Sequence, residues 1–218
     1  MVTNAGHARK AILRSIRKAR KVGRITSATA SALGRRCFPI TYLIRNMLTL
    51  QREDTWMRGS RRVQKNRLLR ILEERARIFL EVNKWIREKS KDEEWRRQIE
   101  SAIEGPSLPP GYCSHCGGCC EIASGFPDFP PETAIPGRWQ RLFGNGLGRG
   151  HRFCAFLWEL DASGQSLCAI HPWRSNPCRV FEKEECEYFM RDLETNDLID
   201  PKAFSVTCRR LFHLINRG

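Results

Sequence analysis

The chain has 218 residues, an apolar content of 41% and a formal net charge of +14. That length allows one medium-sized domain or two small ones, and the apolar content is sufficient for a packed core. No run of 18 or more apolar residues occurs, so we predict no membrane-spanning helix, and the basic N-terminus lacks the apolar stretch of a secretion signal.

The positive charge is concentrated in the first third of the chain. Residues 1–70 carry 18 Lys and Arg against 2 Asp and Glu, a net of +16, whereas residues 71–100 carry 8 of each. Residues 101–218 carry 12 against 14, a net of −2, and they hold every cysteine except Cys37. Two modules with different partners are the simplest account of this asymmetry.

Residues 1–36 are predicted to begin with an amphipathic helix. Arg and Lys separate apolar residues that recur every three or four positions, at Ala8, Ile12, Ile16, Ala19 and Val22. A polar stretch of small residues follows at 26–34. Three interpretations stay open: a cleavable organelle transit segment, an arm that binds phosphates, and a helix that packs on its own protein or on a neighbouring subunit.

Further helical stretches are predicted up to residue 104. An apolar segment covers residues 40–50. Residues 61–89 are predicted as one long helix, because its apolar positions share a face: Leu68, Leu72, Phe79, Val82 and Ile86. Three prolines and two glycines then lie within residues 105–111, where a helix cannot continue. We therefore place a basic helical region at 1–104 and a linker at 105–111.

The cysteine-rich module is predicted over residues 112–190. Cys113, Cys116 and Cys119 follow one another at two-residue spacing, which lets their thiolates turn toward one point, and Gly117 and Gly118 let the backbone aim N–H groups at sulfur. Three close cysteines with a remote fourth match the ligand pattern of a 4Fe–4S cluster, whereas structural zinc more often uses two separated pairs. The spacing favours iron–sulfur over zinc. Disulfides remain an alternative that the missing export signal argues against, since a reducing compartment is expected.

Four sequence blocks resemble the YkgJ-type CxxCxxCC family, which is described as a zinc- or iron-chelating domain. They are Cys113-x2-Cys116-Gly-x-Cys119-Cys120, Cys154-Ala-Phe-Leu157, Cys168-Ala-Ile170-His171 and Arg174-x3-Cys178-Arg179-Val-Phe181. They span residues 113–181, about a third of the chain. The resemblance implies a site rather than a reaction, with metal ligands drawn from Cys113, Cys116, Cys119, Cys120, Cys154, Cys168 and Cys178.

Other residues of this module stay outside the predicted ligand set. Cys186 either ligates or is a surface thiol beside several glutamates, and Cys37 and Cys208 are expected to be free, buried cysteines. His115 and His171 lie within the blocks but compete with many thiolates for a metal. Arg174 and Arg179 flank the last thiolate and either offset its charge or pair with the acidic residues that follow.

A C-terminal helix is predicted over residues 200–217, because Asp200 and Pro201 form a helix start. The predicted fold class is mainly α: a basic helical N-terminal region, a small loop-rich, metal-stabilised cysteine module and a C-terminal helix. The leading functional hypothesis is an accessory or structural metal-cluster protein whose basic region docks to an anionic partner such as RNA, a ribonucleoprotein or an acidic protein.

Two other functional hypotheses stay open. One is a redox or group-transfer enzyme, for example a protein-methylating one, that uses the cluster, although the sequence identifies no catalytic residue. The other is a structural zinc module in an organellar complex. The expected location is the cytoplasm, with a mitochondrion or another organelle as the alternative that the basic N-terminal segment offers.

Overall fold

Helices predominate in this protein, whose structure is a computed structural model. Among the described residues, 67% are helical and 5% lie in strands, which confirms the mainly α prediction. The structure describes residues 2–52, 59–89, 93–94, 97, 117–122, 128–129, 135–141, 153–160, 165–171, 174–175, 178, 181–188, 206, 209–210 and 213. Of residues 2–11, 48–52, 89 and 122 it describes the backbone alone.

The first helix, α1 (Val2–Lys21), is the amphipathic helix predicted for the start of the chain. Ile12, Ile16 and Ala19 are buried along its inner face. Val22 was predicted on the same face but is 54% exposed, because the helix ends before it. A Schellman pair of backbone hydrogen bonds closes the helix around Gly23, whose φ of 66° turns the chain away.

The polar stretch after α1 forms a short helix, α2 (Ser27–Leu33), which the sequence pattern did not predict. Thr26 caps it, since its hydroxyl oxygen accepts a hydrogen bond of 3.1 Å from the Thr29 N–H. Ala30, Ala32 and Leu33 are buried. These small side chains let α2 pack against α4, so tertiary packing stabilises a helix that is too short to form alone.

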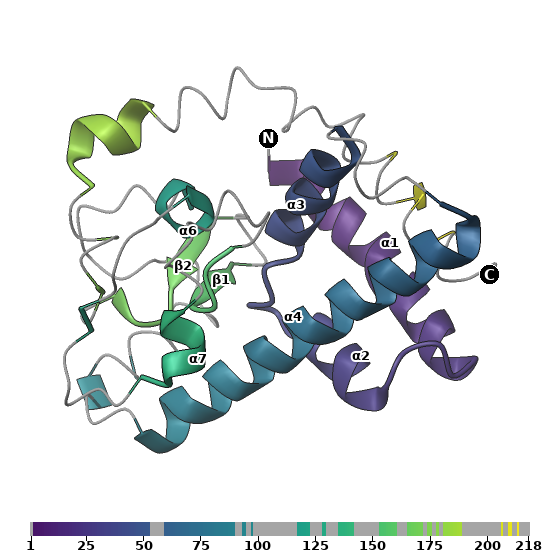
Figure 1. Cartoon of the computed structure of the whole chain (residues 1–218), viewed down its shortest axis with the longest axis horizontal. Helices are drawn as coiled ribbons and strands as arrows, with labels where there is room; N and C mark the ends of the chain where they lie inside the picture. The colour runs from purple at the N-terminus through teal and green to yellow at the C-terminus, as the bar shows by residue number, and fades with distance from the viewer. Residues whose placement is uncertain are drawn as a thin grey trace.

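The two longer predicted helices are present. α3 (Ile40–Arg52) covers the apolar stretch at 40–50, and α4 (Arg61–Lys89) has the predicted bounds. The predicted apolar face of α4 is buried, as Leu68, Leu72, Phe79, Val82 and Ile86 all are. Figure 1 shows α4 running diagonally across the molecule. Different parts of its length therefore face the other helices and the cysteine segment, which is the described part of the predicted cysteine-rich module at 112–190.

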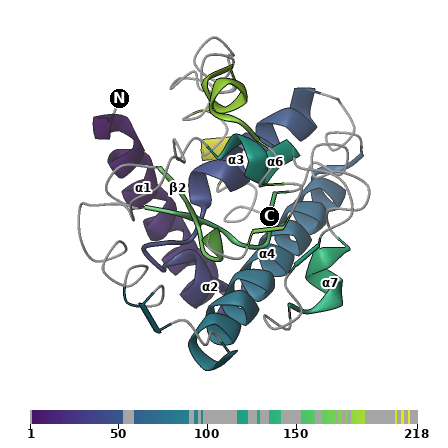
Figure 2. The ribbon, with the colours of Figure 1, turned by 90° about the vertical axis from the view of Figure 1, so that its left-hand side faces the viewer.

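The cysteine segment adds two short helices and a hairpin. The helices are α6 (Gly118–Ile122) and α7 (Gly137–Gln140). The strands β1 (Leu157–Glu159) and β2 (Ser166–Cys168) pair antiparallel, with Trp158 opposite Leu167. The sequence pattern predicted loops here and no strands. Figure 2 views the molecule from the side that carries α6, α7 and the hairpin.

One hydrophobic core joins the helical region to the cysteine segment. Phe79 of α4 lies between Phe38 and Trp158, with ring centroids 5.2 and 6.1 Å away. The ring centroids of Trp139 of α7 and Trp85 of α4 lie 6.1 Å apart. The described parts of the two predicted modules therefore pack against each other, while the linker predicted at 105–111 lies outside the described residues.

Two buried polar side chains also tie the regions together. The Glu159 carboxylate, in a residue only 2% exposed, accepts hydrogen bonds from the N–H (2.8 Å) and the hydroxyl (2.5 Å) of Thr41. Because Thr41 lies in the first turn of α3, this carboxylate caps the helix N-terminus. From α4, Arg75 donates a hydrogen bond of 3.1 Å to the Phe153 carbonyl, and its guanidinium lies 4.1 Å from the Phe153 ring centroid.

The C-terminal helix predicted at 200–217 is described at four positions. Val206, Arg209, Arg210 and His213 are helical and exposed, and its other residues lie outside the described part of the chain. None of the described helices is both long enough and apolar enough to cross a membrane.

Candidate functional site

Five of the seven predicted ligand cysteines are described, and they come from four separate segments. Cys119 and Cys120 lie in α6, Cys154 precedes β1, Cys168 ends β2, and Cys178 comes ten positions after the end of β2. The Cys154 N–H donates to the Cys120 carbonyl at 2.7 Å, which ties α6 to the start of the hairpin. The other two predicted ligands, Cys113 and Cys116, lie outside the described residues.

The thiols of these segments contact one another. Cys119 hydrogen-bonds to Cys120 and Cys178, and Cys120 also hydrogen-bonds to Cys154. Cys168 lies near enough for the charges of Cys154 and Cys119 to act on its pKa. The structure therefore brings together cysteines that are up to 59 positions apart in the sequence, from Cys119 to Cys178.

The pKa of Cys119 is shifted in the opposite direction to those of Cys120, Cys168 and Cys178. Hydrogen bonds from the thiols of Cys120 and Cys178 hold the pKa of Cys119 well below its usual range. The same hydrogen bonds, together with burial, raise the pKa of Cys120 and Cys178. Burial raises the pKa of Cys168. A bound cation would lower the pKa of every thiol that coordinates it.

Backbone N–H groups point at two of the sulfurs. The Phe156 N–H donates to Cys154 Sγ at 3.4 Å. The Ile170 N–H hydrogen-bonds to Cys168 and lowers its pKa, although burial has the larger and opposite effect. In both cases the donor follows its cysteine by two residues. Such N–H···S contacts stabilise thiolate charge.

Arg174 and Ser175, which precede Cys178 in the sequence, also contribute to the environment of the thiols. The charge of Arg174 lowers the pKa of Cys119 further, after the larger effects of the hydrogen bonds from Cys120 and Cys178. This favours the interpretation in which Arg174 offsets thiolate charge; Arg179 lies outside the described residues. The hydroxyl of Ser175 is buried and has no hydrogen-bond partner within the described part of the chain, so it can donate to a nearby acceptor.

The described sulfurs are neighbours, but they do not form a closed ligand shell. No group of three or more Cys, His, Asp or Glu side chains among the described residues is arranged to hold a metal ion. The thiol contacts instead run as a chain from Cys178 through Cys119 and Cys120 to Cys154. The donor chemistry is that of soft sulfur ligands, which suits zinc and iron–sulfur clusters.

Helix α3 supports the turn that leads into α6. Gly117 has a φ of 78°, and a Cβ at this position would overlap the buried ring of Tyr42, so both backbone and space require glycine. Arg45 lies 5.1 Å from the Tyr42 ring centroid and forms a 2.7 Å ion pair with Glu121 of α6. Burial raises the pKa of Tyr42 and that of Glu121. The sequence pattern did not indicate these three supporting side chains. The Gly117–Gly118 pair indicated the turn but not the contact of the turn with Tyr42.

The remaining candidates occupy other positions. Cys37 is buried, and its carbonyl accepts a 3.1 Å hydrogen bond from the Glu159 N–H. Cys186 is half-buried in a helical turn at 183–188. Neither takes part in the thiol hydrogen bonds described above. His171 is half-buried, and its carbonyl accepts from Arg174. His115 and Cys208 lie outside the described residues.

A second candidate site is the cationic face of α1. Its exposed side chains are Arg14, Arg17, Lys18, Arg20 and Lys21. No ion pair between described residues joins any of these five to a carboxylate. The opposite face of the helix is part of the core. This packing favours the interpretation of α1 as a helix that packs on its own protein, with its cations on the surface.

No protein-family model matches the chain, and neither a curated protein nor a solved structure matches it. The resemblance to the CxxCxxCC family therefore rests on the four sequence blocks at residues 113–181 alone.

Proposed function

We propose that the chain binds a metal through cysteine thiolates, with an iron–sulfur cluster as the favoured occupant and zinc as the alternative. The ligands come from the predicted set of Cys113, Cys116, Cys119, Cys120, Cys154, Cys168 and Cys178. One observation carries the proposal: five of these thiols come from four separate segments and are in contact or in electrostatic reach of one another. Buried thiols are costly to ionise, and a metal ion offsets that cost.

Three further features support a thiolate centre of this kind. N–H groups donate to Cys154 and Cys168, Arg174 brings a positive charge near Cys119, and the buried Ser175 hydroxyl lies three residues before Cys178. Hydrogen bonds and charges around sulfur set the stability and the reduction potential of iron–sulfur clusters. Seven thiols exceed the four that one site needs, so some of them act around the site or belong to a second one.

When bound, such a cluster supplies folding energy to a segment with little regular structure and can accept and donate single electrons. The contribution of the chain is then to exclude water through the aromatic core and to hold the ligand segments on α3 and α4. The fold thus favours an accessory or structural role for the metal centre.

The test is anaerobic purification of the full chain with analysis of iron, acid-labile sulfide and zinc. We expect brown protein with iron and sulfide in similar amounts. Cys154→Ser should lose most of this metal, because Cys154 contacts Cys120 and receives the Phe156 N–H. The matched controls Cys37→Ser, at another buried cysteine, and Cys186→Ser, at a half-buried one, should retain it.

Each outcome of this test is informative. Colourless protein with stoichiometric zinc would contradict the cluster and retain the thiolate centre. Protein without bound metal, or equal metal loss in Cys154→Ser and both controls, would overturn the proposal. Circular dichroism of each variant shows whether the helical region is still folded.

We further propose that the basic N-terminal region docks to an anionic partner, for which RNA is the favoured class. The five exposed cations of α1 support this, since they lie on a rigid helix whose other face is buried in the core. Phosphates neutralised by such side chains release counterions, which makes binding strong at low salt and weak at high salt.

Replacing Arg17, Lys18 and Lys21 by Gln is expected to weaken RNA binding at least tenfold at low salt and to reduce its salt dependence by about one unit of slope per lost contact. Anisotropy titrations of labelled single-stranded RNA measure both quantities. Removal of residues 1–36 is not a clean test, because Ile12, Ile16 and Leu33 belong to the core. Unchanged affinity in the triple variant would overturn the assignment of α1 as the docking surface.

A further inference from the structure

The hydroxyl of Ser175 is a buried polar group without a hydrogen bond to any described residue. The residue is only 1% exposed, and its Oγ has no hydrogen-bond partner within the described part of the chain. Burying a hydroxyl without a hydrogen bond costs free energy, and the large majority of buried polar side chains in folded proteins have a partner. Ser175 therefore indicates that the folded protein holds a further acceptor beside this hydroxyl.

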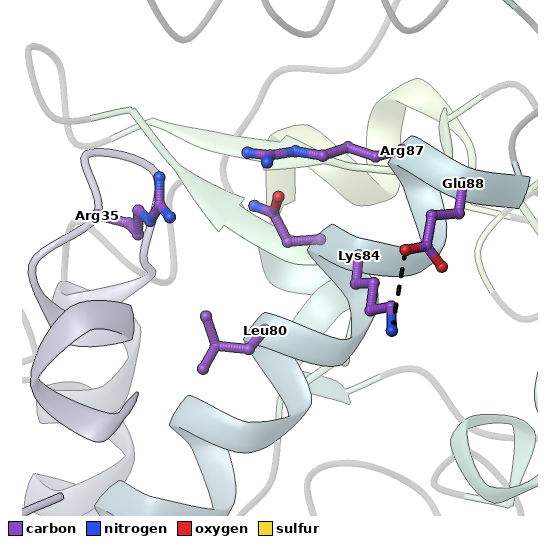
Figure 3. Close-up of a pocket in the computed structure, with 6 residues that line it drawn as sticks. Arg35, Leu80, Lys84, Arg87 and Glu88 are labelled. Carbon is purple, nitrogen blue, oxygen red and sulfur yellow. Dashed lines mark ion pairs between the residues drawn. The ribbon is translucent and has the colours of Figure 1, made fainter. Parts of the chain in front are cut away.

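The charged side chains of the pocket between α2 and α4, by contrast, already have partners within the chain. This pocket has a volume of about 210 Å³ and is lined by Arg35, Leu80, Asn83, Lys84, Arg87 and Glu88 (Figure 3). The ammonium of Lys84 lies 3.8 Å from the Glu88 carboxylate, and Arg35 and Arg87 both interact with other groups of the chain. The charges of the pocket lining thus act within the fold.

The backbone places Ser175 beside the predicted ligand thiols. The Cys178 N–H donates a hydrogen bond of 3.0 Å to the Ser175 carbonyl, so one tight turn joins the two residues. The thiol of Cys178 in turn hydrogen-bonds to Cys119. On the other side of Ser175, Arg174 lies near enough to Cys119 and Cys168 for its charge to act on both thiols. Residues on both sides of Ser175 are therefore within reach of the same sulfurs.

A thiolate sulfur is the acceptor whose chemistry fits this position. The sulfur of a neutral thiol accepts hydrogen bonds only weakly, whereas metal-bound thiolates carry negative charge that hydrogen-bond donors stabilise. Backbone N–H groups already donate to the sulfurs of Cys154 and Cys168. A serine hydroxyl adds a donor that can rotate its proton toward the acceptor.

We propose that the Ser175 hydroxyl donates a hydrogen bond to a metal-bound thiolate of the cysteine site and raises the reduction potential of its iron–sulfur cluster. The proposal rests on the proposed metal binding and assigns Ser175 as the residue that tunes it. Reduction adds a negative charge to the cluster, so a donor at sulfur stabilises the reduced form more than the oxidised form. If zinc occupies the site, the same hydrogen bond strengthens zinc binding.

The experiment measures the midpoint reduction potential of the full-length, metal-loaded protein by titration with dithionite, monitored by electron paramagnetic resonance. In Ser175→Ala, the equilibrium constant for reduction is expected to fall about tenfold, which is about 59 mV for a one-electron couple. Ser175→Thr keeps the hydroxyl and should stay close to the wild type. The matched control Thr29→Val removes another buried hydroxyl, which is paired with Thr26 at 2.9 Å in the α2 region, and should leave the potential unchanged.

A second measurement detects the hydrogen bond itself. After exchange into D₂O, pulsed electron paramagnetic resonance of the reduced cluster should show one deuteron coupling in the wild type that Ser175→Ala lacks and Thr29→Val retains. Circular dichroism shows whether each variant keeps its helices. If Ser175→Ala loses them, Ser175→Gly removes the same hydroxyl with a smaller side chain and takes its place.

The outcomes separate this proposal from the metal centre on which it rests. A cluster whose potential is the same in wild type, Ser175→Ala and Thr29→Val, or shifts equally in both variants, would overturn the role of Ser175 while the cluster stands. If the protein contains zinc, chelator competition replaces the potential, and Ser175→Ala should hold zinc about tenfold more weakly than Thr29→Val; equal zinc affinity would overturn the role of Ser175. If the protein binds no metal, both proposals fail.

Discussion

Replacing Gly117 by alanine is expected to lower the free energy of unfolding by about 2–5 kcal/mol. Two costs add at this position. The φ of 78° lies in the left-handed region, where a side chain costs about 1–2 kcal/mol. The new Cβ would also overlap the ring of Tyr42, which is buried and cannot swing into solvent; overpacking of this kind costs about 1–3 kcal/mol. Chemical denaturation of the two proteins measures the difference.

The matched control for Gly117 is Gly23. It also has a positive φ, 66°, but a Cβ there would meet no atom within 4 Å, so Gly23→Ala should cost about 1–2 kcal/mol. Tyr42→Leu combined with Gly117→Ala should be less destabilising than the sum of the single changes, because the smaller side chain relieves the overlap. Equal costs at Gly117 and Gly23 would contradict the contact between α3 and the turn before α6.

Replacing Glu159 by glutamine is expected to cost about 2–3 kcal/mol, since hydrogen bonds to buried charged groups have this magnitude. Both carboxylate oxygens accept hydrogen bonds from Thr41, one from the N–H and one from the hydroxyl. Glutamine has one acceptor oxygen, so one of these two donors would lose its partner. The change also removes a negative charge from the N-terminus of α3, where the helix dipole favours it.

Glu81 provides the control for Glu159. Its carboxylate accepts hydrogen bonds from two arginines, from Arg77 at 2.9 Å and from two N–H groups of Arg138 at 2.9 and 3.2 Å. The Glu81 side chain is more exposed than that of Glu159, and its two partners are exposed as well. Glu81→Gln should therefore cost less than about 1 kcal/mol. A double-mutant cycle of Glu159→Gln with Thr41→Val should show coupling. If Glu159→Gln and Glu81→Gln have the same small effect, the capping of α3 by Glu159 is wrong.

The sequence was a good guide where structure follows from local periodicity. The helix at 61–89 was predicted with the bounds that α4 has, because its apolar positions recur at helical spacing from Leu68 to Ile86, where they form a buried face. α1 and α3 were predicted for the same reason. α2 was missed, since seven residues of small side chains carry no periodic signal and the helix depends on its packing against α4. The strands were missed because three residues each are too short to alternate visibly.

The residues of the candidate site were likewise predictable from the sequence only in part. Spacing selected Cys113, Cys116 and Cys119, and the resemblance to the CxxCxxCC family implied Cys120, Cys154, Cys168 and Cys178 as further ligands. The five of these seven cysteines that are described lie close together. The side chains that support them could not be selected from spacing. Tyr42 and Arg45 are more than 70 positions before Gly117 and Glu121, and nothing in their own surroundings distinguishes them from other residues of an apolar helix.

By itself, the sequence determined that the chain is mainly helical, that its positive charge lies in the first third, and which cysteines are the candidate ligands. Only the tertiary structure decided that α1 is part of the core, that Glu159 caps α3 across 118 positions, and that Arg35 and Arg87 line the same pocket. The physical reason is the distance along the sequence over which each kind of interaction acts. Helix periodicity and ligand spacing are set by residues within a turn or two, whereas burial, capping and charge pairing between distant segments exist only once the whole chain has closed around a common core.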